Sequence, residues 1–113
     1  MKTADQYDNA AKQLKGAANV LYGASFTEAV QTNQPSDTDP NPTPYRYGQL
    51  VIDCPTSDVD IALVEAGRQA VLVDGYLIMN LHEGFARICV SVYGPVGPTM
   101  ADACAPNPAR FDI

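Results

Sequence analysis

The feature that most constrains the fold is an alternating pattern on both sides of residues 83–84, in "YLIMNLHEGFARICVSVY" (76–93). Read as a two-residue turn, 83–84 closes a β-hairpin that pairs His82 with Phe85, Met79 with Ile88, and Leu77 with Val90. One face of this hairpin is fully apolar: Leu77, Met79, Leu81, Ala86, Ile88, Val90 and Val92. The other is mixed: Tyr76, Ile78, Asn80, His82, Phe85, Arg87, Cys89, Ser91 and Tyr93. Because a one-residue slip would exchange the two faces, the register is well specified.

Two further segments extend this sheet in the prediction. Asp74-Gly75 is a strong hairpin signal between "AVLV" (70–73) and the strand that follows, which predicts a three-stranded antiparallel meander. Upstream, "QLVIDC" (49–54) alternates apolar and polar residues and predicts a strand in which Cys54 points to the core side. A helix is predicted from Ser57 to Ala66, with Gly67 ending it.

Residues 3–22 predict an amphipathic N-terminal helix. Thr3 is placed to act as its N-cap, and Gly23 lies where a C-cap belongs. An alanine-rich apolar stripe recurs at spacings of three and four: Ala4, Tyr7, Ala11, Leu14, Ala18, Leu21 and Tyr22. A stripe of small residues suits close packing against a sheet. We expect this helix to make its packing interactions through Tyr7, Leu14, Ala18 and Leu21.

The expected fold is therefore an α+β domain spanning 1–113, with the helix (1–24) packed on an antiparallel sheet. A proline-rich loop (31–48) leads into a β-α-β-β-β segment (49–93), and an irregular tail (94–113) follows. Tyr45 and Tyr47, at the end of the loop, are the aromatic residues we expect at an interface.

Charge and hydropathy exclude several classes of function. The net charge is −6 and the seven Lys and Arg residues are scattered, which argues against nucleic-acid binding and against adhesion to anionic membranes. No run of 18 apolar residues exists, so no membrane span is expected. The start lacks the apolar region of a secretory signal, which leaves either a mature or truncated chain with an added Met, or a cytosolic product.

No motif for catalysis or cofactor binding is present, and we expect neither an enzyme nor a cofactor. The single histidine, His82, falls at a turn. Asp37, Asp39 and Asn41 have the spacing that opens a calcium loop, but Pro42 and Gly48 occupy positions where an EF-hand needs Gly and Glu. These three residues remain weak calcium candidates, the alternative being a solvated loop.

The three cysteines bear on the compartment. Cys89 lies on the mixed face, and a bond to Cys104 would clamp the tail over that face, closing a loop of about 15 residues worth roughly 3 kcal/mol. We predict this bond, with Cys54–Cys104 as the rival pairing and three reduced thiols as the alternative. A disulfide would place the chain in an oxidising compartment.

This arrangement resembles the globular head of a type IV pilin or pseudopilin: a helix over residues 4–22, the loop 31–48, strands within 50–93, and the segment 89–104 between two cysteines. The helix from 57 to 66 inside the sheet is similar to the type IVb variety. The apolar N-terminal segment of that family, with a glutamate near its start, is absent. The resemblance implies a structural subunit of an extracellular filament (a fimbrium), active in filament assembly and cell adhesion. Its partners would be protein subunits, either further copies or a partner pilin helix. Its place would be the cell surface, with passage through the periplasm before assembly.

Two other classes stay open. A bacteriophage virion accessory subunit, such as a tail or head-completion protein, shares the small size and polar loops and works with reduced cysteines. A small cytosolic thiol or ligand-binding domain is favoured only if Cys54 is exposed and acidic.

Overall fold

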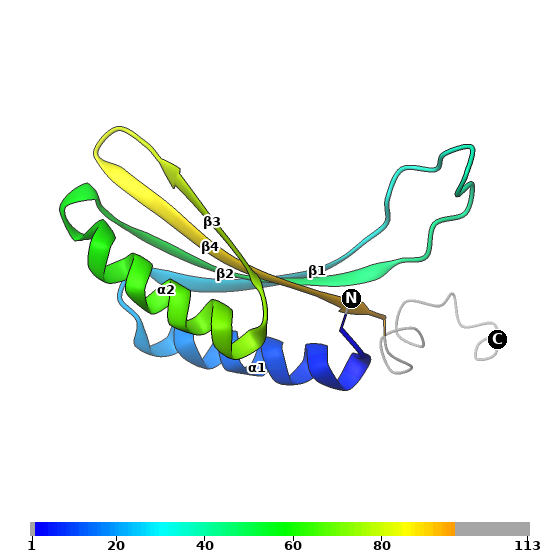
Figure 1. Ribbon diagram of the computed structural model, residues 1–113, viewed down its shortest axis with the longest axis horizontal. Helices are drawn as coiled ribbons and strands as arrows, with labels where there is room; N and C mark the ends of the chain where they lie inside the picture. Colours follow the sequence, from blue (N-terminus) through cyan, green and yellow to red (C-terminus); the bar gives the residue numbers. More distant parts are fainter. Residues whose placement is uncertain (1, 97–113) are drawn as a thin grey trace.

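Two helices cover one face of a four-stranded antiparallel sheet in the computed structural model, which describes residues 2–96 (Figure 1). The elements follow in the order α1 (Ala4–Val20), β1 (Ala24–Gln31), β2 (Tyr45–Pro55), a short 3-10 turn (Thr56–Asp58), α2 (Val59–Val73), β3 (Tyr76–Leu81) and β4 (Phe85–Pro95). The strands lie in the order β1-β2-β4-β3, so β3 and β1 are the two edges. The α+β class predicted from the sequence is confirmed.

Helix α1 begins as predicted at Thr3. The Thr3 hydroxyl accepts the Gln6 backbone N–H at 3.1 Å, and the Gln6 side chain accepts the Thr3 N–H at 2.9 Å, which forms a capping box. The buried stripe of the helix is Tyr7, Ala10, Ala11, Leu14 and Ala17. The three alanines of this stripe bring α1 close to the sheet. After the helix, Gly23 adopts a positive φ of 75° and its carbonyl accepts the Asp53 N–H at 3.0 Å.

The hairpin register is confirmed. Leu77 lies opposite Val90 and Met79 opposite Ile88 across β3 and β4, as the alternating pattern requires. Strand β2 alternates in the same way, and its buried positions are Arg46, Gly48, Leu50, Ile52 and Cys54. The core lies between these faces and the two helices, with Leu50, Ile88, Val90 and Val92 at its centre.

The meander prediction is wrong in its first strand. Residues 70–73 form the last turn of α2 instead, and Gly67 lies inside this helix. Asp74 is the helix C-cap in a left-handed conformation with φ 50°, and Gly75 donates its N–H to the Ala70 carbonyl at 2.9 Å. The same dipeptide chemistry that suits a hairpin therefore ends a helix here. Continued burial of Ala66, Gln69 and Val73 on one side of α2 offsets the helix propensity that a glycine lacks.

The sheet also gains a strand that the sequence did not reveal. Residues 24–31 form edge strand β1, and residues 45–48 belong to β2, so the proline-rich loop is shorter than the predicted 31–48. Glu28 hides the pattern of β1, because it places a carboxylate on the face that points toward α1. At the other end, β4 extends to Pro95 and shortens the predicted tail, of which residues 97–113 lie outside the described part.

Candidate interaction surfaces

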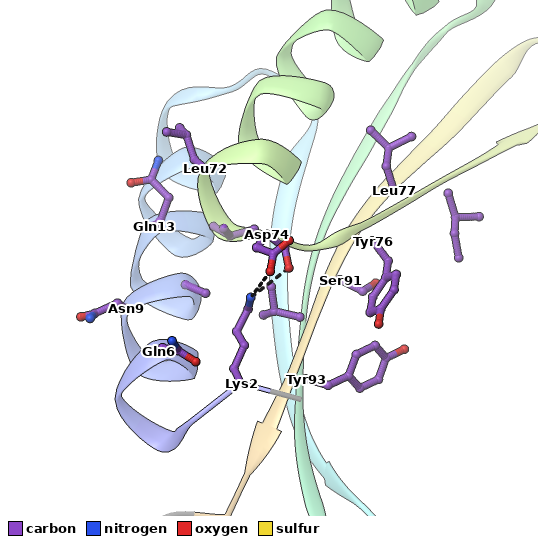
Figure 2. Close-up of a pocket in the computed structure, with 14 residues that line it drawn as sticks. Lys2, Gln6, Asn9, Gln13, Leu72, Asp74, Tyr76, Leu77, Ser91 and Tyr93 are labelled. Carbon is purple, nitrogen blue, oxygen red and sulfur yellow. Dashed lines mark hydrogen bonds and ion pairs between the residues drawn. The ribbon is translucent and has the colours of Figure 1, made fainter.

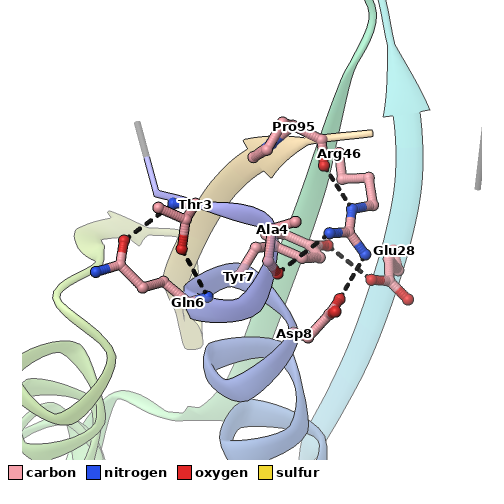
Figure 3. Close-up of polar contacts among 8 residues, drawn as sticks. All are labelled: Thr3, Ala4, Gln6, Tyr7, Asp8, Glu28, Arg46 and Pro95. Carbon is pink, nitrogen blue, oxygen red and sulfur yellow. Dashed lines mark hydrogen bonds and ion pairs between the residues drawn. The ribbon is translucent and has the colours of Figure 1, made fainter. Parts of the chain in front are cut away.

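A polar network fastens the start of α1 to the sheet (Figure 3). Arg46 of β2 is only 7% exposed and donates to the Asp8 carboxylate at 2.6 Å and to the Pro95 carbonyl at 2.8 Å. Its guanidinium carbon lies 4.3 Å from the centre of the Tyr7 ring. The Tyr7 hydroxyl in turn donates to the Glu28 carboxylate at 2.7 Å. Tyr7 of α1 thus contacts a side chain of β1 and a side chain of β2.

Burial raises the pKa of Tyr7 well above its usual value of 10, and the hydrogen bond to Glu28 and the Glu28 charge raise it further. The free energy of unfolding should therefore fall at alkaline pH. An unfolded Tyr7 releases its proton above pH 10 while the folded one keeps it, so the free energy of unfolding decreases by up to about 1.4 kcal/mol per pH unit. Tyr7→Phe should lose this dependence. Urea unfolding of both proteins from pH 8 upward measures the difference. Parallel pH curves for the two proteins would contradict it.

The predicted packing residues of α1 contact the chain's own sheet and helices. Tyr7 and Leu14 are fully buried, and Ala18 and Leu21 are partly buried against the same core. This side of α1 is therefore occupied within the fold. The opposite side of the helix is polar and solvent-exposed, with Asp5, Lys12 and Lys15 among its residues.

The face of the sheet that the helices leave open carries a tyrosine cluster, which we define as Tyr45, Tyr47, Tyr76 and Tyr93. The Tyr93 ring centre lies 5.0 Å from that of Tyr47 and 5.9 Å from those of Tyr45 and Tyr76. Burial, together with the three neighbouring tyrosines, raises the pKa of Tyr93. The two predicted interface tyrosines, Tyr45 and Tyr47, are thus brought together with two others from β3 and β4.

The predicted disulfide clamp is not supported. Cys89 is a free thiol that is 7% exposed, and Cys104 lies outside the described residues. Although Cys89 lies on the open face, its cross-strand neighbours Val51 and Ile78 flank it there. Cys54 is also free and is 8% exposed on the helix side, as its strand position predicts. Burial is the main cause that raises the pKa of both thiols, so neither is the exposed acidic thiol that a redox function needs.

Both thiols should resist iodoacetamide in the folded protein and react with it once the chain is unfolded in the absence of reductant. Burial and a raised pKa both lower the thiolate population available for alkylation. Peptide mass mapping of Cys54 and Cys89 before and after unfolding measures this. A Cys89 that stays unmodified after unfolding, and reacts only after reduction, would restore the disulfide.

The calcium candidates lie in the exposed loop between β1 and β2. Asp37, Asp39 and Asn41 are all exposed, and the backbones of Ser36 and Asp39 exchange two hydrogen bonds, of 3.0 and 3.2 Å, that form a tight turn. Within residues 2–96, no group of three or more His, Cys, Asp or Glu side chains is placed to hold a metal ion. His82, the only histidine, stacks on Phe85 at a ring distance of 4.5 Å on the exposed hairpin end.

A groove of about 1090 Å³ opens where α1, the C-terminal end of α2 and the start of β3 meet (Figure 2). Lys2 reaches across it and donates to the Asp74 backbone carbonyl at 2.9 Å. Tyr76 and Tyr93 lie side by side at one wall, and Leu72 and Leu77 are among its apolar residues. The groove thus joins the tyrosine cluster to the outer side of α2.

Exposed apolar side chains are concentrated on α2 and β3, and sequence reasoning missed this concentration. Nine of the thirteen large apolar residues exposed in the described part of the chain lie on these two elements. On the side of the sheet that carries α2, this α2–β3 surface comprises Ile61, Val64, Val71, Leu72, Leu77, Met79 and Leu81, while Tyr76 and Ile78 lie on the open face. The signal in the sequence is that α2 carries apolar residues on opposite sides, with Ala66 and Val73 buried while Val64 and Val71 are exposed.

Comparisons with protein-family models, with curated proteins and with solved structures find no match to this chain. In the described part of the chain, neither helix combines the length and apolar character that a membrane crossing requires.

Proposed function

We propose that the chain is a structural subunit that assembles with other protein chains through its α2–β3 surface. The observation that carries this proposal is the apolar character of α2 on the side away from the sheet, where Ile61 is 71%, Val64 72% and Val71 82% exposed. A helix that is apolar on all sides is normally buried on all sides. Single exposed apolar residues need no explanation, but Val64 and Val71 lie two turns apart on the same side of α2, and such a group marks a contact site.

The charges on α2 fit such a contact. Glu65 and Arg68 form an ion pair of 3.0 Å on the exposed part of the helix, so its middle carries no net charge. A chain with a formal charge of −6 repels other acidic chains over most of its surface. The Glu65–Arg68 ion pair adds no net charge to that repulsion beside the exposed apolar residues of α2.

We place this subunit in an extracellular filament, as a head domain similar to that of type IV pilins. Three features support this assignment: a helix packed along an antiparallel sheet, a second helix between the strands, and a long exposed proline-rich loop between β1 and β2. In that setting the α2–β3 surface makes subunit contacts, while the loop and the tyrosine cluster are available for adhesion to other surfaces.

A virion accessory subunit is the second candidate, and the state of the thiols favours it. Cys54 and Cys89 are both buried and are not bonded to one another or to any other cysteine within residues 2–96, which suits assembly in a reducing cell interior. Both candidates require protein contacts through the same surface and differ in where the assembly lies.

Immunogold electron microscopy of the producing cells tests the proposal. Antibodies raised against the chain should label filaments outside the cell, and cells in which its gene is deleted serve as the control. Label on virus particles would transfer the assignment to the virion candidate. Diffuse label without any ordered assembly would overturn both.

A further inference from the structure

The structure assigns one partner to the α2–β3 surface: a second copy of this chain, whose β3 pairs with β3 antiparallel about a two-fold axis at Met79. This inference rests on the proposed assembly function, because it names the partner at the same surface. The two four-stranded sheets would then join into one continuous sheet, with an α2 helix on each side of the junction.

Edge strand β3 carries neither a charge nor a proline, two common protections against pairing. Its six residues are all exposed. Natural proteins protect edge strands with charges, prolines or bulges. The other edge differs, since β1 includes Glu28 and its only exposed large apolar residue is Val30.

The backbone of β3 is oriented for a new partner. The His82 N–H donates to the Phe85 carbonyl at 2.8 Å, which fixes the phase of the antiparallel ladder between β3 and β4. Because hydrogen-bonded pairs alternate along such a ladder, Ile78 and Asn80 direct their backbone groups toward β4. Leu77, Met79 and Leu81 therefore direct their N–H and C=O groups outward.

A two-fold axis at Met79 uses all three outward-facing residues. Met79 lies opposite Met79 of the second copy, and Leu77 lies opposite Leu81 on each side of the axis. Each opposed pair exchanges both of its backbone hydrogen bonds, as in a narrow antiparallel pair. An isologous contact of this kind closes as a dimer and leaves no free β3 edge, so assembly beyond two copies would use other surfaces of the dimer.

Electrostatics favour this edge for self-contact. A two-fold contact places identical residues close together, so any charge on the strand would oppose its own copy. Strand β3 has no charged residue, and on α2 the Glu65–Arg68 ion pair of 3.0 Å is neutral overall. Pairing of the two strands therefore brings no like charges of β3 together, although each chain carries a formal charge of −6.

The size of the surface predicts a weak dimer. Strand β3 spans about 20 Å and α2 about 22 Å. The sheet layer and the helix layer lie roughly 10 Å apart, so the side of the molecule that carries β3 and α2 measures on the order of 400 Å². An interface of this area per copy is at the small end for proteins. We therefore expect self-association that depends on concentration within the micromolar range.

Sedimentation equilibrium of the full chain, measured across the micromolar range, tests the pairing. The wild-type chain should shift from monomer to dimer, and Met79→Pro should weaken this association at least about tenfold. Proline at an outward-facing edge position removes an N–H that β4 does not use, so the β3–β4 ladder stays intact. Far-ultraviolet circular dichroism checks that the variant is folded.

Val30→Pro in β1 is the matched control. Val30 is 38% exposed and Met79 39%. The Asp53 N–H donates to the Gly23 carbonyl at 3.0 Å, which fixes which residues of β1 bond to β2. By this alternation the backbone N–H of Val30 also points away from the sheet. This variant should dimerise like the wild type. If Met79→Pro fails to fold, Met79→Lys supplies a charge at the same position and should give the same loss of dimer.

Two results would overturn the inference: a wild-type chain that stays monomeric throughout, or folded Met79 variants that dimerise as well as the wild type. Neither result decides the proposed assembly function. The labelling experiment tests that function separately, because it detects an ordered assembly with any partner chain. Ordered label together with a monomeric chain would point to a partner of different sequence and so overturn only the self-pairing.

Discussion

Replacing Tyr7 with alanine is expected to lower the free energy of unfolding by about 3–5 kcal/mol, the cost of deleting a buried aromatic side chain. Tyr7 is 0% exposed and lies at the point where α1 meets the sheet. Its ring also lies against the Arg46 guanidinium, at 4.3 Å, and its hydroxyl donates to Glu28 at 2.7 Å. The substitution therefore leaves a cavity and removes a neighbour of a buried cation.

Urea unfolding followed by far-ultraviolet circular dichroism measures this loss. Tyr22→Ala is the matched control, because Tyr22 follows the same helix and is 95% exposed. The control should change the free energy of unfolding by less than about 0.5 kcal/mol. A cost below about 1 kcal/mol for Tyr7→Ala would mean that the contact between α1 and the sheet is not the centre of the core.

A local sequence pattern was sufficient to predict the structure where only one structure is compatible with that pattern. Thr3 fits an N-cap only at a helix start, and the hairpin 76–93 has a single register that puts its apolar residues on one face. Both predictions are confirmed. Asp74-Gly75 is different, because a positive φ serves a hairpin turn and a helix C-cap equally well. Only the packing of α2 on the sheet decides between the two.

Strand β1 was missed for a related reason. Glu28 interrupts the apolar alternation on the helix-facing side, and its partner, the Tyr7 hydroxyl, is separated from it by 21 residues in sequence. Six of the eight residues of β1 are exposed, Glu28 among them, and the strand is fixed by its pairing with β2, which lies in a distant part of the sequence. Single-sequence patterns do not contain that information.

The candidate surfaces could be predicted only in part. Tyr45 and Tyr47 were expected at an interface because of their residue type, and the sheet brings them together with Tyr93. The α2–β3 surface required knowledge that residues 70–73 are helical. Read as a strand, Val71 and Leu72 belong to a sheet, whereas in α2 they are 82% and 58% exposed. Val71 and Leu72 are recognised as exposed apolar residues only when residues 70–73 are placed on a helix.

Gly94→Ala is expected to lower the free energy of unfolding by about 1–3 kcal/mol, because it overpacks the same contact from the strand side. A Cβ at Gly94 would overlap the Tyr7 Cβ and would lie 2.8 Å from the Tyr7 Cγ. Neither atom belongs to the flexible end of a side chain, so α1 would have to move away from β4. Gly94 thus sets how closely the helix approaches the sheet.

Gly16→Ala is the control of opposite sign. Gly16 lies inside α1, and a Cβ there would meet nothing within 4 Å. Alanine at that position should raise the free energy of unfolding by about 0.5–1 kcal/mol, since it only improves helix propensity. Urea unfolding of the two variants therefore separates close packing from backbone preference. Equal effects of the two substitutions would mean that α1 does not rest on β4 at Gly94. Opposite signs would place the Tyr7–Gly94 contact at the junction between the layers, where one added methyl group outweighs the gain from a better helix former.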